Sequence, residues 1–230
     1  MKSWALLAGL VVAVVAGASA GPVSASVGGS VMLGASSSKL DGFNDIASDP
    51  RREIAGGFGL RFPLGNSLSL EPQLLWLFKG GEGHIDLVST APGSTETTSF
   101  DFTYAANYLE LPVMLRWETA LSGLRFHLSG GSSIARLLSS ESEFHFDSVT
   151  VQNPPPGMAF AQIFEGVGTA DALAIKDWDA SLIAGAGVAF GGAPLRVTAD
   201  VRYFHGILNV SEAPVGAYNR TWLLTLGLEW

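Results

Sequence analysis

Hydrophobic and polar residues alternate over much of this chain. From Thr221 to Trp230, every even position carries tryptophan or leucine, while the odd positions carry threonine, leucine, glycine or glutamate. A period of two puts successive side chains on opposite faces of an extended strand, so one face of this segment is entirely apolar. The same pattern predicts strands at about residues 23–35, 54–62, 67–78, 108–117, 124–129, 178–190, 195–203 and 221–230.

The connections between these strands alternate in length. "PLGN", "ETALSG" and "GGA" are short turns, whereas the segments after the first, third, fifth and seventh strands are long and rich in Ser, Gly and Asp, the longest being residues 139–177. Short turns on the periplasmic side and long loops outside are typical of outer-membrane barrels. The sequence therefore predicts an all-β fold, an eight-stranded antiparallel up-and-down transmembrane β-barrel. The fifth strand is the least regular, and a bulge at Gly130-Gly131 would change its parity before Ile134.

Charged residues distinguish the two faces of the predicted sheet. In six of the eight strands the apolar face has no charge, and the opposite faces collect five arginines and five carboxylates. A soluble ligand-binding barrel would have the reverse arrangement, with an apolar cavity inside. The charges are therefore expected to pair in the lumen and to plug it. They are Arg61, Glu71, Glu110, Arg116, Arg125, Asp179, Arg196, Asp200, Arg202 and Glu229.

Aromatic residues gather at the strand ends on the apolar face. Such rings settle at the two membrane–water interfaces, so they predict two girdles around the barrel. The girdle at the turn side consists of Phe62, Trp117, Phe190 and Trp230, and the girdle at the loop side consists of Trp76, Phe78, Trp178, Tyr203 and Trp222.

The first twenty residues have the features of a secretory signal peptide. Lys2 precedes an apolar stretch from Trp4 to Ala16, and Ala18 and Ala20 form the small-x-small pattern of a cleavage site before Gly21. The expected domains are a signal peptide at residues 1–20 and an outer-membrane barrel at residues 21–230. Without Lys2 the chain has 12 basic and 21 acidic residues, which argues against nucleic-acid binding. The absence of cysteine excludes disulfides and thiolate metal sites.

Two segments resemble a known family. "FGLRFPLGNSLSLEPQLLWLFKGG" followed by "YLELPVMLRW" is similar to the core of the PorT-like outer-membrane β-barrel family, over residues 54–117. The chain departs from the family's Pro-Glu-Leu-Leu, with Glu71-Pro72-Gln73-Leu74 in its place. The resemblance implies an eight-stranded barrel, but the secretion role of founding members does not transfer, because family barrels differ in their loops. The terminal Trp230 resembles the signal read by the barrel-assembly machinery.

Candidate catalytic residues are few. His127 and Ser129 resemble the His-x-Ser of barrel lipid A deacylases, but they lie near the periplasmic end, away from the outer leaflet. His84 and Asp86 lie in a loop suited to an omptin-type protease, which would need more strands and more acids. Asp41, Asp45 and Asp49 lack the spacing of a Ca²⁺ loop. We expect no catalytic, cofactor or metal site.

The sequence therefore favours a small porin-like outer-membrane barrel of the cell envelope with a structural, adhesive or accessory role. Its expected partners are outer-membrane lipid, lipopolysaccharide and, during biogenesis, the barrel-assembly machinery. The alternatives are an outer-leaflet lipid-modifying enzyme and a narrow gated channel.

Overall fold

The alternating segments form long strands in the computed structural model, which describes residues 27–42, 48–91, 94–121, 123–152, 166–169, 175–192, 194–212 and 216–230. The predicted signal peptide at residues 1–20, with its cleavage site at Ala18, Ala20 and Gly21, lies outside these ranges. In the described part of the chain, no helix is long and apolar enough to cross a membrane.

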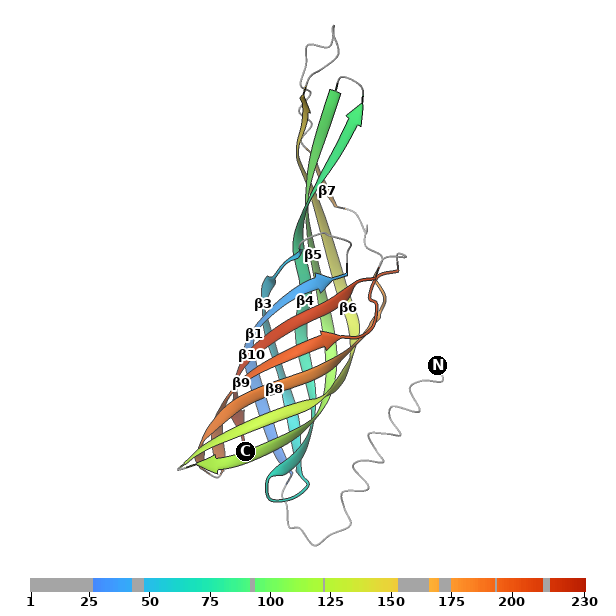
Figure 1. Ribbon diagram of the computed structural model, residues 1–230. Helices are drawn as coiled ribbons and strands as arrows, with labels where there is room; N and C mark the ends of the chain where they lie inside the picture. The colour runs from blue at the N-terminus through green and yellow to red at the C-terminus, as the bar shows by residue number, and fades with distance from the viewer. Residues whose placement is uncertain are drawn as a thin grey trace, which may run out of the picture.

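Eight long strands close into a single barrel (Figure 1). Neighbouring strands are antiparallel, and β1 pairs with β10 to close the sheet. The predicted all-β, eight-stranded barrel is therefore confirmed. Its strands are β1 (Gly28–Asp41), β3 (Arg51–Pro63), β4 (Leu68–Ala91), β5 (Ser94–Leu121), β6 (Leu124–Gln152), β8 (Trp178–Gly192), β9 (Leu195–Gly206) and β10 (Tyr218–Glu229), while β2 (Ser48–Asp49) and β7 (Gly166–Thr169) are short strands paired to β4 and β6.

The outer face of the barrel is apolar and exposed. Leu33 of β1 is 66% exposed, and Leu224 and Leu226 of β10 are 60% and 65% exposed. Their neighbours on the inner face, such as Leu223 and Thr225, are buried. These are the faces that the alternation predicts. An apolar band of this kind is suited to contact with lipid hydrocarbon, where backbone groups must be paired within the protein, as in a closed sheet.

Three strands are much longer than the rest. β4, β5 and β6 have 24, 28 and 29 residues, whereas β9 and β10 have 12 each. A tilted strand needs only about 9 to 11 residues to cross the hydrocarbon. The surplus residues continue the sheet beyond the barrel, and Figure 1 shows this projection at the end opposite the C-terminus. We call it the extracellular sheet; it consists of residues 82–91, 94–103 and 142–152 with β7.

The extracellular sheet corrects two expected loops. The connection after the third predicted strand is largely a hairpin of β4 and β5, and the expected loop at residues 139–177 begins as a continuation of β6 to Gln152. Residues 153–165 and 170–174 lie outside the described residues. The sequence alternates in the extracellular sheet too, as "FHF" and "VTV" of β6 show, so the pattern itself extends past the length that a membrane crossing needs.

The expected irregularity of the fifth strand lies elsewhere. Pairing of Gly130 and Gly131 with both neighbouring strands is continuous, so the bulge suggested there is wrong. The register instead shifts where Asn107 pairs with Ser139 and Tyr108 pairs with Leu137. Leu138 is therefore the extra residue, at the level where β6 leaves the barrel.

Candidate functional site

The inner face of the barrel holds its charged residues in layers. At the turn end, Arg61 of β3 contacts Glu71 of β4 with Nε at 2.7 Å and Glu229 of β10 with Nη2 at 2.5 Å. Arg116 of β5 contacts the same two carboxylates through Nη1, at 2.6 Å from Glu229 and 3.5 Å from Glu71. Two guanidinium groups and two carboxylates thus alternate across four strands. Such charge-assisted pairs are stronger than neutral hydrogen bonds.

Glu118 extends this layer at the turn end of the barrel, which we call the inner-end layer. Its carboxylate lies 3.0 Å from Arg116, 2.7 Å from Arg125 and 3.4 Å from Arg196. It is absent from the predicted network because "ETALSG" looks like a turn, whereas β5 continues through it to Leu121. Glu118 lies two residues after Arg116, so a longer strand at this position would have predicted that its side chain also points inward.

A histidine and an aspartate form the next layer. His127 Nε2 lies 2.6 Å from Asp200 Oδ1, and both side chains are buried. Gly187 pairs with both residues across the sheet, and a Cβ atom there would collide with the His127 ring. Arg202 lies 3.7 Å from Asp200 and donates a hydrogen bond of 2.6 Å to Gln73.

A buried lysine lies near the outer end of the lumen. Lys79 Nζ is 2.8 Å from Asp179 and 3.1 Å from Glu110, and all three side chains are 0% exposed. The ammonium also lies 5.0 Å from the centre of the Tyr108 ring, which favours a cation–π contact. Lys79 is missing from the predicted network, because the expected strand ends at Phe78, one residue earlier. Lys79 lies six residues after Gln73 on β4, so its side chain has the same inward direction.

Polar neighbours support the two carboxylates of this outer layer. Ser133 donates a hydrogen bond of 2.5 Å to Glu110, and Asn219 donates one of 2.9 Å to Asp179. The hydroxyls of Tyr104 and Tyr108 are also buried in this part of the lumen. The layer therefore combines one cation and two acids in a site without solvent contact.

Apolar side chains separate and cover the charged layers. One cluster fills the middle of the lumen and consists of Met32, Ala55, Leu75, Leu77, Met114, Ile183, Phe204 and Leu223. A second covers the Lys79 layer and consists of Leu40, Tyr104, Ala106, Tyr108, Ala135, Val210 and Ala217. Of the ten charges named from the sequence, Glu71, Glu110, Arg116, Asp179, Asp200, Arg202 and Glu229 are buried, Arg61 and Arg196 are partly buried, and the Arg125 side chain is 42% exposed. Lys79, Glu118 and His127 join them.

The other candidates are arranged as follows. No hydrogen bond joins His127 to Ser129, and the histidine ring is held by Asp200 instead. His84 contacts Asp101 at 2.6 Å on the exposed extracellular sheet, and the side chain of Asp86 is outside the described set. Among the described residues no group of three or more His, Cys, Asp or Glu could hold a metal ion.

The aromatic residues lie on the outer face at both ends of the barrel. Trp117, Phe190 and Trp230 at the turn end are 48%, 48% and 62% exposed, and Phe62 is partly buried. At the outer end, Trp76 and Trp222 are 57% and 56% exposed. Phe78 stacks on Trp76 at 6.1 Å, Tyr203 packs against Trp222 at 4.7 Å, and Trp178 is partly buried.

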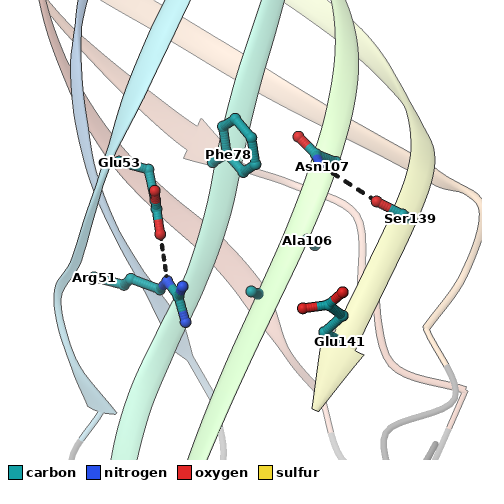
Figure 2. A pocket seen from close by; sticks show the side chains of 8 residues that line it. Arg51, Glu53, Phe78, Ala106, Asn107, Ser139 and Glu141 are labelled. Carbon is teal, nitrogen blue, oxygen red and sulfur yellow. Dashed lines mark hydrogen bonds and ion pairs between the residues drawn. The ribbon is translucent and has the colours of Figure 1, made fainter.

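A pocket of about 340 Å³ lies beside the outer girdle (Figure 2). Its volume is in the range of small-molecule sites. The side chains around it are mostly polar or charged, and no feature of the sequence pattern indicates it, because its walls come from four strands, β3, β4, β5 and β6. It is lined by Arg51, Glu53, Phe78, Ala105, Ala106, Asn107, Ser139 and Glu141.

Comparison with protein families identifies the barrel. The family model described as "Outer membrane protein beta-barrel domain" matches residues 18–212. The chain belongs to this family. The protein is therefore a β-barrel of the bacterial outer membrane. The match does not single out the PorT-like group that residues 54–117 resemble. Comparison with curated protein sequences gives no match.

Solved structures with a similar fold are distant in sequence. Ail, the attachment invasion locus protein of Yersinia pestis, is 13% identical with a TM-score of 0.39, covering 90% of this chain and 100% of that chain. OprG from Pseudomonas aeruginosa is 9% identical with a TM-score of 0.43, covering 88% and 94%. The outer membrane enzyme PagL is 12% identical with a TM-score of 0.32, covering 88% and 97%. None of their activities is transferred.

Proposed function

We propose that this protein is a non-catalytic, non-conducting barrel that displays an extracellular sheet for adhesive or accessory contacts. The observation that carries the proposal is the complete burial of Lys79, Glu110 and Asp179, whose side chains are 0% exposed. Charged groups that line a water-filled channel would be accessible to solvent. Here they are paired with one another, as buried charges must be.

The extracellular sheet supplies the binding element of this proposal. Among the described residues, β2 covers the edge of β4 only at Glu82 and Gly83, and from Ile85 to Ala91 β4 pairs with β5 alone. On the other side, and again within the described ranges, β7 covers β6 only from Glu143 to Phe146. Free strand edges offer backbone donors and acceptors to another extended chain. A rigid sheet held clear of the membrane is therefore suited to contacts between cells or proteins.

The finer assignments follow from the same features. The resemblance of residues 54–117 supports placement in the PorT-like group, and the apolar band supports outer-membrane lipid and lipopolysaccharide as surroundings. Trp230, whose backbone N and O pair with Gly29 at 3.0 and 3.1 Å, supports recognition by the barrel-assembly machinery. The engagement of His127 by Asp200 supports a role without catalysis.

Planar-bilayer recording of the purified protein tests the closed lumen. We expect no large, steady conductance, and stable openings would contradict the proposal. The display role is tested on cells: replacing residues 85–100 with a short turn should leave heat-modifiable migration intact while reducing cell–cell aggregation and retention on glass. Equal adhesion by both proteins would overturn the adhesive part.

A further inference from the structure

The wall of the barrel is interrupted between β3 and β4. Their pairing extends up to Gly56 with Trp76 and resumes only where Asp49 of β2 meets Glu82. Residues 50–55 and 77–81 do not pair with each other, although β3 stays paired with β1. The Ser36 hydroxyl donates to the Phe78 carbonyl at 3.1 Å, which satisfies one acceptor that the missing ladder leaves. The 340 Å³ pocket opens at this interruption.

Two opposite charges in the pocket have unused hydrogen-bonding capacity. Arg51 contacts Glu53 through Nε at 2.8 Å, and among the described residues no hydrogen bond engages its two Nη atoms. Glu141 is exposed, and within the described part of the chain its carboxylate has neither a hydrogen bond nor an ion pair. Figure 2 shows the two side chains reaching toward the pocket from opposite sides, one from β3 and one from β6.

The floor between these charges is aromatic and held in place. Phe78 stacks on Trp76, and the planes of the two rings differ by 18°. Trp76 Nε1 donates to Asn107 at 2.7 Å, and the Asn107 amide donates to Ser139 at 3.3 Å. These contacts fix the ring and the amide before any ligand arrives, which lowers the entropic cost of binding.

The pocket lies next to the outer aromatic girdle. Trp76 belongs to that girdle, and Phe78, two residues further along β4, forms part of the pocket wall. Tryptophan rings on the outer face mark the level of the lipid headgroups. The pocket is therefore within reach of a headgroup of the outer leaflet and of a solute from outside.

We propose that this pocket binds a zwitterion of the phosphoethanolamine class, which has a primary ammonium and a phosphate a few bonds apart. The free Nη atoms of Arg51 hold the phosphate, since a guanidinium fork matches phosphate oxygens. The Glu141 carboxylate accepts hydrogen bonds from the ammonium, and the Phe78 ring lies beside it for a cation–π contact. The source is a lipid headgroup or a free compound. The proposal does not depend on the adhesive role.

Binding of free O-phosphoethanolamine to the detergent-folded protein tests the chemistry. Titration calorimetry should show binding of this probe, and ethanolamine and glycerol 3-phosphate, which each lack one charge, should bind at least about tenfold more weakly. Arg51→Gln and Glu141→Gln should each weaken binding about tenfold, and Arg51→Lys should recover part of the loss. Equal affinity for all three probes would overturn the zwitterion proposal.

Matched controls separate the pocket from general surface charge. Arg52→Gln and Glu143→Gln remove the same charges from exposed neighbours that do not line the pocket, and they should leave affinity unchanged. Heat-modifiable migration checks that every variant is folded. A loss with Arg52→Gln or Glu143→Gln as large as with the pocket variants would contradict the site.

Nanodiscs distinguish the two sources. If the ligand is a headgroup, the lipid in discs of phosphatidylethanolamine should occupy the pocket, so added O-phosphoethanolamine should compete less well there than in discs of phosphatidylcholine. Glu141→Gln should remove the difference between the two discs. Equal competition in both discs, with binding in detergent retained, assigns the site to a free compound. Absence of binding in detergent and in both discs overturns the proposal and leaves the closed-barrel function untouched.

Discussion

At the scale of single residues, the interior depends on matched neighbours. Gly187 leaves room for the contact between His127 and Asp200, because its hydrogen faces the imidazole. Lys79 is the shared cationic partner of two carboxylates that have no access to water. In both places one residue determines whether the charged or polar side chains around it fit in the buried interior.

Gly187→Ala should destabilise the barrel by about 1 to 3 kcal/mol, because the new methyl group meets the His127 ring and lies 2.5 Å from the Ala199 carbonyl oxygen. Urea-dependent unfolding in detergent measures this. The control is Gly192→Ala, where no atom lies within 4 Å of the added Cβ. Equal stability of the two variants would show that the interior adapts without cost.

Lys79→Met should cost about 3 to 5 kcal/mol of unfolding free energy, since it leaves two carboxylates buried without a cation. The triple variant with Glu110→Gln and Asp179→Asn should recover much of the loss. Lys39→Met, at an exposed position of β1, is the control. The test is again urea-dependent unfolding, and a Lys79→Met protein as stable as the control would refute the pairing.

At the scale of strands, the boundary between lipid and lumen determines what the sequence reveals. The eight strands could be predicted because lipid on one side and paired charges on the other impose strict alternation, as Leu224 and Leu226 against Thr225 show. Lys79 and Glu118 were missed because each lies just past the end of a clear pattern. The pocket could not be predicted, since Arg51 and Glu141 are 90 positions apart in the sequence and line one pocket only after the strands are arranged in space.

Leu226→Lys tests the outer face at this scale. Leu226 is 65% exposed and lies midway between the girdle residues Trp222 and Trp230, so an ammonium there should cost about 2 to 4 kcal/mol in a bilayer. Folding into lipid vesicles at graded urea concentrations measures the effect. Leu208→Lys, beyond the end of β9, should cost much less. A similar cost at both positions would show that the lipid-facing band extends to Leu208.

At the scale of the whole molecule, closure joins the two ends of the described chain. Trp230 pairs its backbone with Gly29, and its ring lies over that glycine, so the last residue completes the seam between β10 and β1. Glu229, one residue earlier, connects the same seam to Arg61 and Arg116 inside the lumen.

Deleting Trp230 should slow assembly in cells, because both the closing backbone pair and the interfacial ring are lost, while Trp230→Phe should be tolerated. The kinetics of heat-modifiable migration after pulse labelling report this. Glu229→Ala separates assembly from stability: it should lower unfolding stability, by removing one of the carboxylates that pair with Arg61 and Arg116, and change the assembly rate little. Normal assembly of the deletion would exclude Trp230 as an assembly signal.

The layered charges also give the lumen an electrical polarity. The inner-end layer has four guanidinium groups against three carboxylates, whereas the outer layer has one ammonium against two acids. The apolar cluster around Leu75 and Leu77 keeps the two ends apart. A passage opened by replacing both leucines with serine would therefore have a cation-attracting mouth outside and an anion-attracting mouth inside. Such a passage should rectify current, and reversing the membrane voltage in a bilayer would reveal the asymmetry.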